Sequence, residues 1–276
     1  MLGKKTANAF AYIALSVGAL VILLPMYLTV IVAFKSPEMT AKNFFMPPTT
    51  LYLENFKQVF AASNFWNFVG NSVLITFLSL AGIAFITPLV SYSVSRNMDR
   101  RYYRVLYYLL VSGTFIPFTV LMVPQIKLMS SLNATNKWGL ILLYWTFGLS
   151  EGTLLCTGYI NGVPKDLEEA AYIDGAGVLY TFIKVIYPII TPIIVALMIM
   201  DALWIWNDFQ LPLLMLNARE SLWTLPLFQY NFRSKYTVDY NLAFAAFLLS
   251  TLPIMIAYLI AQKQIVNGLT AGAIKA

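Results

Sequence analysis

Six long apolar runs constrain this 276-residue chain more than any other feature of its sequence. A helix needs about 20 consecutive, mainly apolar residues to cross the hydrocarbon core of a bilayer. The runs cover residues 10–34, 69–94, 105–125, 138–160, 185–206 and 242–261. A lipid-embedded backbone must satisfy its hydrogen bonds internally, so each run is predicted to be a helix. The predicted fold class is therefore all-α, a polytopic membrane protein with six transmembrane helices.

The composition excludes most classes of soluble enzyme. Charged residues make up 11% of the chain, and a soluble domain carries about 25%. Histidine is absent, which excludes a Ser-His-Asp triad and any histidine-based metal site. The single cysteine, Cys156, cannot form an intramolecular disulfide and is predicted to pack inside a helix. No G-x-x-x-x-G-K-[ST] phosphate loop is present, so we expect no ATP hydrolysis and no bound cofactor in this chain.

The orientation in the membrane is predicted from the basic residues. The net charge is +6, but the basic residues are scattered between apolar runs, so no nucleic acid partner is expected. Loops on both sides contain lysine and arginine, and the assignment depends on one dense cluster in the short loop after the second run: Arg96, Arg100, Arg101 and Arg104. Short cytoplasmic loops are enriched in such residues, which places both termini in the cytoplasm. The first run is too long for a signal peptide and is expected to be retained.

The loop at 161–190, between the fourth and fifth runs, is predicted to form a cytoplasmic helix-turn-helix. Pro164 suits a helix start, and acidic residues follow it, where the helix dipole favours negative charge. Gly175 is a natural helix terminator, and a second short helix is expected at 178–187, before Pro188. Small residues on the surface allow another protein to approach closely. The alternative is an ordinary interfacial loop whose alanines follow helix propensity alone.

Within this loop, Glu169-Ala170-Ala171, Asp174-Gly175-Ala176 and Pro188 resemble the EAA loop of binding-protein-dependent ABC importers. The chain departs from that pattern at Val185 and Tyr187, where the family often has isoleucine and leucine. The segment from Trp206 to Phe209 and the tail from Gln262 are similar to carbohydrate permeases of the maltose and multiple-sugar type. The resemblance implies an ABC importer type I permease fold and the import of a sugar or oligosaccharide.

The resemblance also implies partners. These are a second homologous permease, an ATPase dimer that holds ATP and magnesium, an extracytoplasmic solute-binding protein, the sugar and membrane lipid, all at a bacterial cytoplasmic membrane. The residues expected to couple to the ATPase are Glu169, Ala170, Ala171, Asp174, Gly175 and Ala176. Glu169 would supply the polar contact, and Gly175 the turn.

We expect a single permease domain over residues 1–276. Its core is predicted at 66–262 and contains the loop at 161–190. The first helix and an outer segment occupy 1–65. The tail at 263–276 is expected in the cytoplasm, and by resemblance it reaches between the ATPase subunits.

The sugar path is predicted from polar and aromatic residues within or beside the spans. Ionisable residues inside a membrane are costly and are functional candidates for that reason. The candidates are Asp201, Trp204, Asn207, Asp208 and Gln125. Asp201, Trp204 and Asp208 recur at roughly helical spacing, and Gln125 follows two prolines in the third run. The alternatives are a structural hydrogen bond for Asp201, and a helix cap with an interfacial anchor for residues 206–208.

Three other functions compete with this interpretation. An ion-coupled secondary transporter would need acid–base pairs in several spans, but the runs are nearly free of charge. A membrane scaffold or sensor would not need both a small-residue cytoplasmic loop and an intramembrane acid. An ABC permease for a non-sugar solute, such as a peptide, is the remaining alternative within the family.

Overall fold

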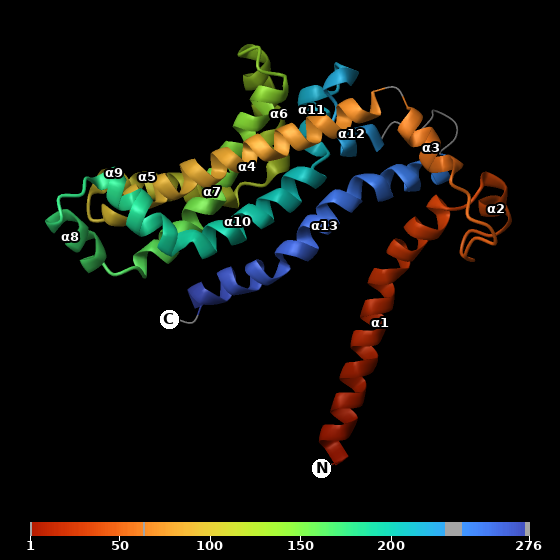
Figure 1. The fold of residues 1–276 in the computed structure, drawn as a ribbon, viewed down its shortest axis with the longest axis horizontal. Helices are drawn as coiled ribbons and strands as arrows, with labels where there is room; N and C mark the ends of the chain where they lie inside the picture. The colour runs from red at the N-terminus through yellow and green to blue at the C-terminus, as the bar shows by residue number, and fades with distance from the viewer. Residues whose placement is uncertain (1, 63, 230–238, 274–276) are drawn as a thin grey trace. The chain divides into compact units, whose positions relative to one another are not determined.

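The computed structural model describes residues 2–62, 64–229 and 239–273, and these residues form helices and the connections between them (Figure 1). The chain divides into two compact units. The first comprises residues 1–66 and 228–252, and the second comprises residues 67–227 and 253–276.

In the first unit, polar side chains close the C-terminal end of a long helix. The unit contains α1 (Leu2–Ala33), α2 (Pro37–Lys42), α3 (Glu54–Ala61) and the first part of α13 (Tyr240–Ala273). The last carbonyls of a helix have no intrahelical partner. Asn55 Nδ2 donates to Ala33 O at 2.9 Å, and Asn241 Nδ2 donates to Val32 O at 3.0 Å. Both amides also donate to Lys35 O, which ties α3 and α13 to the end of α1.

Lys35 itself is buried, at 1% exposure. Its Nζ donates to Asn43 O at 2.9 Å and to Phe44 O at 3.2 Å, and within the described residues it forms no ion pair. Burial lowers the pKa of this ammonium below its ordinary value. Backbone carbonyls therefore hold this charge and fix the turn that follows α2.

In the second unit, α7 (Lys137–Asn161) is central and packs against α5 (Arg101–Ser112), α10 (Tyr187–Asn207) and α11 (Gln210–Leu216). Asn136 starts α7, because its Oδ1 accepts from the N–H groups of Trp138 and Gly139. The unit also contains most of α4 (Phe65–Arg96). The shorter elements are η1 (Gly113–Phe115), α6 (Phe118–Ser131), α8 (Asp166–Ile173), α9 (Val178–Thr181), η2 (Phe182–Ile186), η3 (Glu220–Leu222) and α12 (Leu225–Gln229).

Glycines allow α4 and α7 to pack closely. A Cβ on Gly152 would lie 2.4 Å from Thr87 Cγ2 on α4 and 2.8 Å from Leu197 Cδ2 on α10. A Cβ on Gly148 would lie 2.5 Å from Ile83 Cδ1. Small residues at such positions are the usual means by which membrane helices bring their backbones together.

Gly152→Ala is expected to destabilise the protein by about 1–3 kcal/mol, because the added methyl group has no space between α4 and α10. Gly158→Ala on the same helix is the matched control, since a Cβ there meets nothing within 4 Å. Thermal unfolding in detergent should show a lower Tm for the first variant and no loss for the second. Equal Tm values for both variants would contradict this account of the packing.

The predicted all-α membrane fold is confirmed. In the described residues, five helices are long and apolar enough to cross a membrane: Ala11–Ala33, Phe65–Arg96, Lys137–Asn161, Val178–Asn207 and Tyr240–Gln262. The predicted third span is not one straight helix. The segments Arg101–Phe115 and Phe118–Ser131 meet at 109°, and the total is six if this bent pair is one span. The break lies at Pro117, which has no N–H to donate and holds the preceding Ile116 in an extended conformation.

The second helix of the predicted cytoplasmic loop does not end before the fifth span. Residues 178–207 run continuously through α9, the π-helical turn η2 and α10. In η2, the Tyr187 N–H donates to Phe182 O, five residues back. Pro188 follows directly, and this wide turn accommodates its ring and its missing N–H. The sixth predicted span likewise continues, as α13, to Ala273.

Candidate functional site

The loop predicted to couple to an ATPase folds as α8, a tight turn and α9, at the opposite end of the second unit from α11 and α12 (Figure 1). The Gly175 N–H donates to Tyr172 O at 3.0 Å, and the Ala176 N–H donates to Ala171 O at 2.9 Å. These two bonds form a Schellman motif, which satisfies carbonyls at the end of α8. Gly175 has a φ of +83°, a conformation that glycine adopts without strain. The predicted role of Gly175 as helix terminator is therefore confirmed.

The other predicted coupling residues lie at the surface of this turn. Glu169, Ala170 and Asp174 are exposed, while Ala171 and Ala176 are half-buried. Large apolar side chains around them are also exposed: Ile173, Val178, Leu179 and Tyr180. Ile173 is the most open of these, at 86% exposure. An exposed apolar surface next to a carboxylate is typical of a protein-docking site.

Behind this surface lies an ion pair that the sequence does not predict. Arg96 Nε at the end of α4 donates to Glu168 Oε1 on α8 at 2.6 Å, and the Tyr92 hydroxyl donates to Glu168 Oε2 at 2.6 Å. The three residues line a cavity of about 450 Å³, together with Glu169 and Lys165 among others. In the sequence, Arg96 indicates only the topology, and Glu168 is one of the acidic residues that follow Pro164 at a helix start. No spacing rule connects residues 72 positions apart.

The two central candidates for the sugar path differ sharply in exposure. Asp201 on α10 is 3% exposed, and its Oδ2 has no hydrogen-bond partner in the part of the chain described. Trp204, one turn further along, is 42% exposed and contacts the rings of Tyr144 and Phe147 edge-on. Asp201 therefore belongs to the interior of the second unit, and Trp204 to its surface.

The interior of the second unit also contains buried hydroxyl groups. Thr87 and Ser91 on α4 and Thr153 and Thr157 on α7 are buried, and their hydroxyl oxygens lack partners among the described residues. Leu197 on α10 approaches Thr87 across Gly152, so the three helices meet here. This polar interior is unusual for a region whose other side chains are mostly apolar.

The remaining candidates are separate from this interior. Asn207 is exposed and donates from Nδ2 to Leu203 O on its own helix at 2.8 Å. Gln125 on α6 is half-buried, and its Oε1 has no partner within the described ranges. Both amides retain hydrogen-bonding capacity for a solute. Among described residues, no group of three or more His, Cys, Asp and Glu is placed to hold a metal ion.

Asp208 caps the turn that follows α10. Its Oδ2 accepts from the Tyr144 hydroxyl at 2.8 Å, and its Oδ1 accepts from the Gln210 N–H at 2.9 Å at the start of α11. Burial raises the pKa of this carboxyl above its ordinary value, although the bonds from Tyr144, Gln210 and Leu211 act in the opposite direction. The geometry matches the cap that was the alternative to a sugar contact.

Asp208→Asn is expected to leave the Tm at pH 7 unchanged or raised. The raised pKa means that the folded protein favours the protonated form of the Asp208 carboxyl. The stabilisation from this protonated form is present at low pH and is lost as pH rises through the folded-state pKa, so the charged carboxylate does not stabilise the fold at pH 7. Asparagine keeps an acceptor for the cap without the charge. Asp208→Ala is expected to cost about 1–3 kcal/mol, since the buried Tyr144 hydroxyl loses its acceptor. A higher Tm for alanine than for asparagine would contradict this role.

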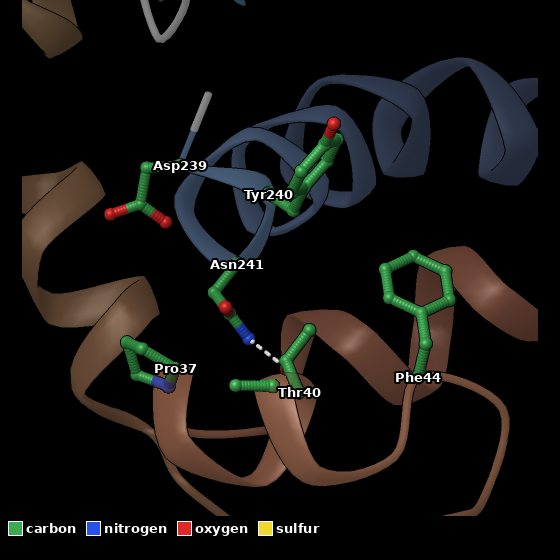
Figure 2. Close-up of a pocket in the computed structure, with 7 residues that line it drawn as sticks. Pro37, Thr40, Phe44, Asp239, Tyr240 and Asn241 are labelled. Atoms are coloured by element: carbon green, nitrogen blue, oxygen red, sulfur yellow. Dashed lines mark hydrogen bonds between the residues drawn. The ribbon is translucent and has the colours of Figure 1, made fainter. Parts of the chain in front are cut away.

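A second cavity lies in the first unit, between α2 and the start of α13. Its volume is about 480 Å³. Figure 2 shows Asp239, Tyr240 and Asn241 opposite Pro37 and Thr40, with Phe44 to one side. Asn241 Nδ2 donates to Thr40 Oγ1 at 2.8 Å, and Asp239 Oδ1 accepts from the Leu242 N–H at 3.0 Å. The Asn241–Thr40 bond joins α2 to α13, and the Asp239 bond caps the start of α13.

The family model and two similar relatives of this chain all describe membrane components of transport systems. The model of the family described as "Binding-protein-dependent transport system inner membrane component" matches residues 87–270. The chain is 43% identical, over 99% of both chains, to the "Multiple sugar-binding transport system permease protein MsmG" of Streptococcus mutans. It is 33% identical, over 91% of both, to the "Probable starch degradation products transport system permease protein AmyC" of Thermoanaerobacterium thermosulfurigenes.

A solved structure has the same fold. It is described as that of a bacterial ABC transporter involved in the import of the acidic polysaccharide alginate. The TM-score is 0.83 at 18% sequence identity, with 95% of this chain and 97% of the other covered. The predicted permease fold is therefore confirmed. The family match at 87–270 includes the whole α8–α9 turn.

Proposed function

We propose that this chain, which belongs to the family of binding-protein-dependent transport system inner membrane components, is a permease that carries a sugar or oligosaccharide across the cytoplasmic membrane. The observation that carries the proposal is the 43% identity, over nearly the full length of both proteins, to a permease named for multiple-sugar transport. The starch-product permease at 33% identity supports the same solute class. The chain is a transport subunit and not an enzyme.

The energy for import comes, in this proposal, from a separate ATPase dimer that docks on α8, Gly175 and α9. The exposed Ile173, Val178 and Leu179 supply an apolar contact area, and Glu169 supplies a charge beside it. The chain has no phosphate loop of its own, so ATP and magnesium belong to the ATPase and this chain binds no cofactor. A second homologous permease and an extracytoplasmic solute-binding protein complete the importer.

Both chain termini are proposed to lie in the cytoplasm. The arginine cluster at 96–104 favours the cytoplasmic side, and the Arg96–Glu168 pair joins it directly to α8. Docking of a cytoplasmic ATPase on α8 requires this same orientation. Thiol labelling of Ile173→Cys, in a chain whose Cys156 is replaced by serine, tests it. We expect no labelling of this cysteine when an impermeant reagent is added to intact cells. Labelling under these conditions would show that α8 lies outside the cell and would contradict the proposed orientation.

The sugar is proposed to contact Trp204, Asn207 and Gln125. The exposed indole offers a face for a sugar ring, and the two amides offer hydrogen bonds to hydroxyl groups. Asp208 contributes by holding Tyr144, whose ring contacts Trp204 edge-on, rather than by touching the sugar. Asp201 lies too deep for direct contact in the described conformation and supports the packing of α10 against α7.

Reconstitution in liposomes tests the proposal. The chain is combined with its permease partner, the ATPase and the binding protein, and ATP-driven uptake of labelled raffinose and maltotriose is compared with uptake of a labelled tetrapeptide. We expect uptake of at least one saccharide, and none when the binding protein or ATP is omitted. Uptake of the peptide with neither saccharide transported would overturn the solute class. It would leave the family membership intact.

A further inference from the structure

Glu168 differs from its neighbours on α8 in being buried. It is the single buried residue among the eight of this helix, whereas Leu167, Glu169 and Ile173 on either side are exposed. A carboxylate is seldom buried unless it is paired. Glu168 is therefore the buried side-chain link from α8 to α4, and the less buried Tyr172 adds a second contact, to Tyr92.

The partner of Glu168 joins two other helix ends. Arg96 is the last residue of α4, and its Nε bonds to Glu168. Its Nη1 donates to Ile160 O at 3.1 Å, and its Nη2 donates to Val163 O at 3.0 Å. Ile160 lies in the last turn of α7, and Val163 lies in the connection from α7 to α8. One guanidinium thus bonds to α7, to this connection and to α8.

Tyr92 extends the network to the fifth span. Its hydroxyl bonds to the second oxygen of Glu168, and its ring lies 5.2 Å from the ring of Phe182 in η2. Phe182 in turn contacts Tyr187 at 5.9 Å, and the Tyr187 hydroxyl donates to Ala84 O on α4 at 3.2 Å. Both oxygens of Glu168 therefore hold α8 against α4, and the Tyr187 bond holds α4 against α10.

We propose that Arg96, Glu168 and Tyr92 are positioning residues that couple α4, in addition to α7 and α10, to the movement of α8. The covalent chain links α8 only to α7 and α10. The ion pair adds a direct link from α8 to the end of α4, so a displacement of α8 moves all three helices together. This inference rests on the proposed function, because it assumes that an ATPase displaces α8.

The structure gives a reason why the link is needed. Glycine residues flank α8 on both sides, at Gly162 before it and at Gly175 and Gly177 after it. Such connections tolerate changes in backbone angle. Without the ion pair, α8 is held to α4 only through Tyr92 and can tilt more easily on its connections. Separating Arg96 from Glu168 would leave a buried charge unpaired, which is costly and favours movement of α4 and α8 together.

Glu168→Gln, Arg96→Gln and Tyr92→Phe test the inference in the fully assembled importer. The measured quantity is the number of solute molecules taken up per ATP hydrolysed, together with ATP hydrolysis in the absence of binding protein. We expect Glu168→Gln and Arg96→Gln each to lower uptake per ATP about tenfold, and Tyr92→Phe to lower it less, because one hydrogen bond is lost.

The double variant Arg96→Gln/Glu168→Gln should be no worse than the more affected single variant, because the two residues act through each other. Arg101→Gln, an exposed arginine of the same cluster, is the matched control and should keep the wild-type ratio.

A purely structural role gives a different result. The variants would then reduce the amount of assembled complex, but the complex that forms would keep the wild-type uptake per ATP, and this outcome overturns the inference. If Arg96→Gln does not assemble, Glu168→Gln and Tyr92→Phe decide, since both preserve the shape of the side chain. Failure of the proposed function is distinguishable, because the wild-type complex would then take up no saccharide.

Discussion

Glu169→Lys is expected to lower saccharide uptake by about 100-fold or more while the chain still inserts and assembles. Glu169 is exposed on the proposed docking surface, and lysine reverses the charge that the ATPase meets. Opposed like charges across an interface cost several kcal/mol, which corresponds to a factor of this size. The new lysine would also lie four residues from Lys165, at the helix end that disfavours positive charge. Uptake and ATP hydrolysis in proteoliposomes check the result.

Asp166→Lys is the matched control for Glu169→Lys. Asp166 is also exposed, lies on the same helix and undergoes the same charge reversal, but it does not line the cavity at Glu169. It therefore reports the effect of charge on α8 itself. Equal loss of uptake in both variants would mean that net charge, and not contact at Glu169, is what matters. Normal uptake in Glu169→Lys would remove Glu169 from the coupling surface.

Gly175→Asp is expected to abolish uptake and to leave ATP hydrolysis uncoupled from transport. At a φ of +83°, any residue other than glycine is strained by about 1–3 kcal/mol. No atom lies within 4 Å of a Cβ placed there, so the side chain itself does not clash within the chain. The strain is expected to break the two backbone bonds that end α8, and the carboxylate would project from the turn into the docking surface.

Gly177→Ala is the control for Gly175→Asp, and Gly175→Ala separates the two effects. Gly177 has a φ of −79°, and a Cβ there also meets nothing, so alanine should be tolerated. Gly175→Ala adds the backbone strain without the charge and is expected to lose part of the uptake. Full uptake with aspartate at position 175 would show that neither the turn nor its surface transmits motion.

The sequence predicted the membrane helices because an apolar run of 20 residues has few alternative structures. Residues 69–94 and 138–160 match α4 and α7 closely for this reason. The third run, residues 105–125, did not predict the bend in this segment, because hydropathy averaged over about 20 residues is not sensitive to a change in helix direction. Pro117 indicated a weak point there, but the 109° angle between the two segments depends on tertiary packing.

The surface of the coupling loop was also predictable, since the Schellman turn at Gly175 follows local rules. The attachment of α8 to the end of α4 was not predictable. Glu168 and Glu169 are adjacent and chemically identical, and only the fold places one against Arg96 and the other at the surface. Likewise, the spacing of Asp201 and Trp204 was compatible with one shared face, whereas the structure buries the first and exposes the second.

The π-helical turn η2 determines which way the side chains of α10 point. It holds one residue more than an α-helical turn would, and each residue of an α-helix rotates the chain by about 100°. Every side chain from Tyr187 to Asn207 is therefore set about 100° around the helix axis from its place in an uninterrupted helix begun at Val178. Loss of a single residue between 182 and 186 would restore a regular helix and turn Asp201 out of the interior of the second unit. The five residues of η2, near the start of the fifth span, thus set the rotation of all the side chains that follow in it.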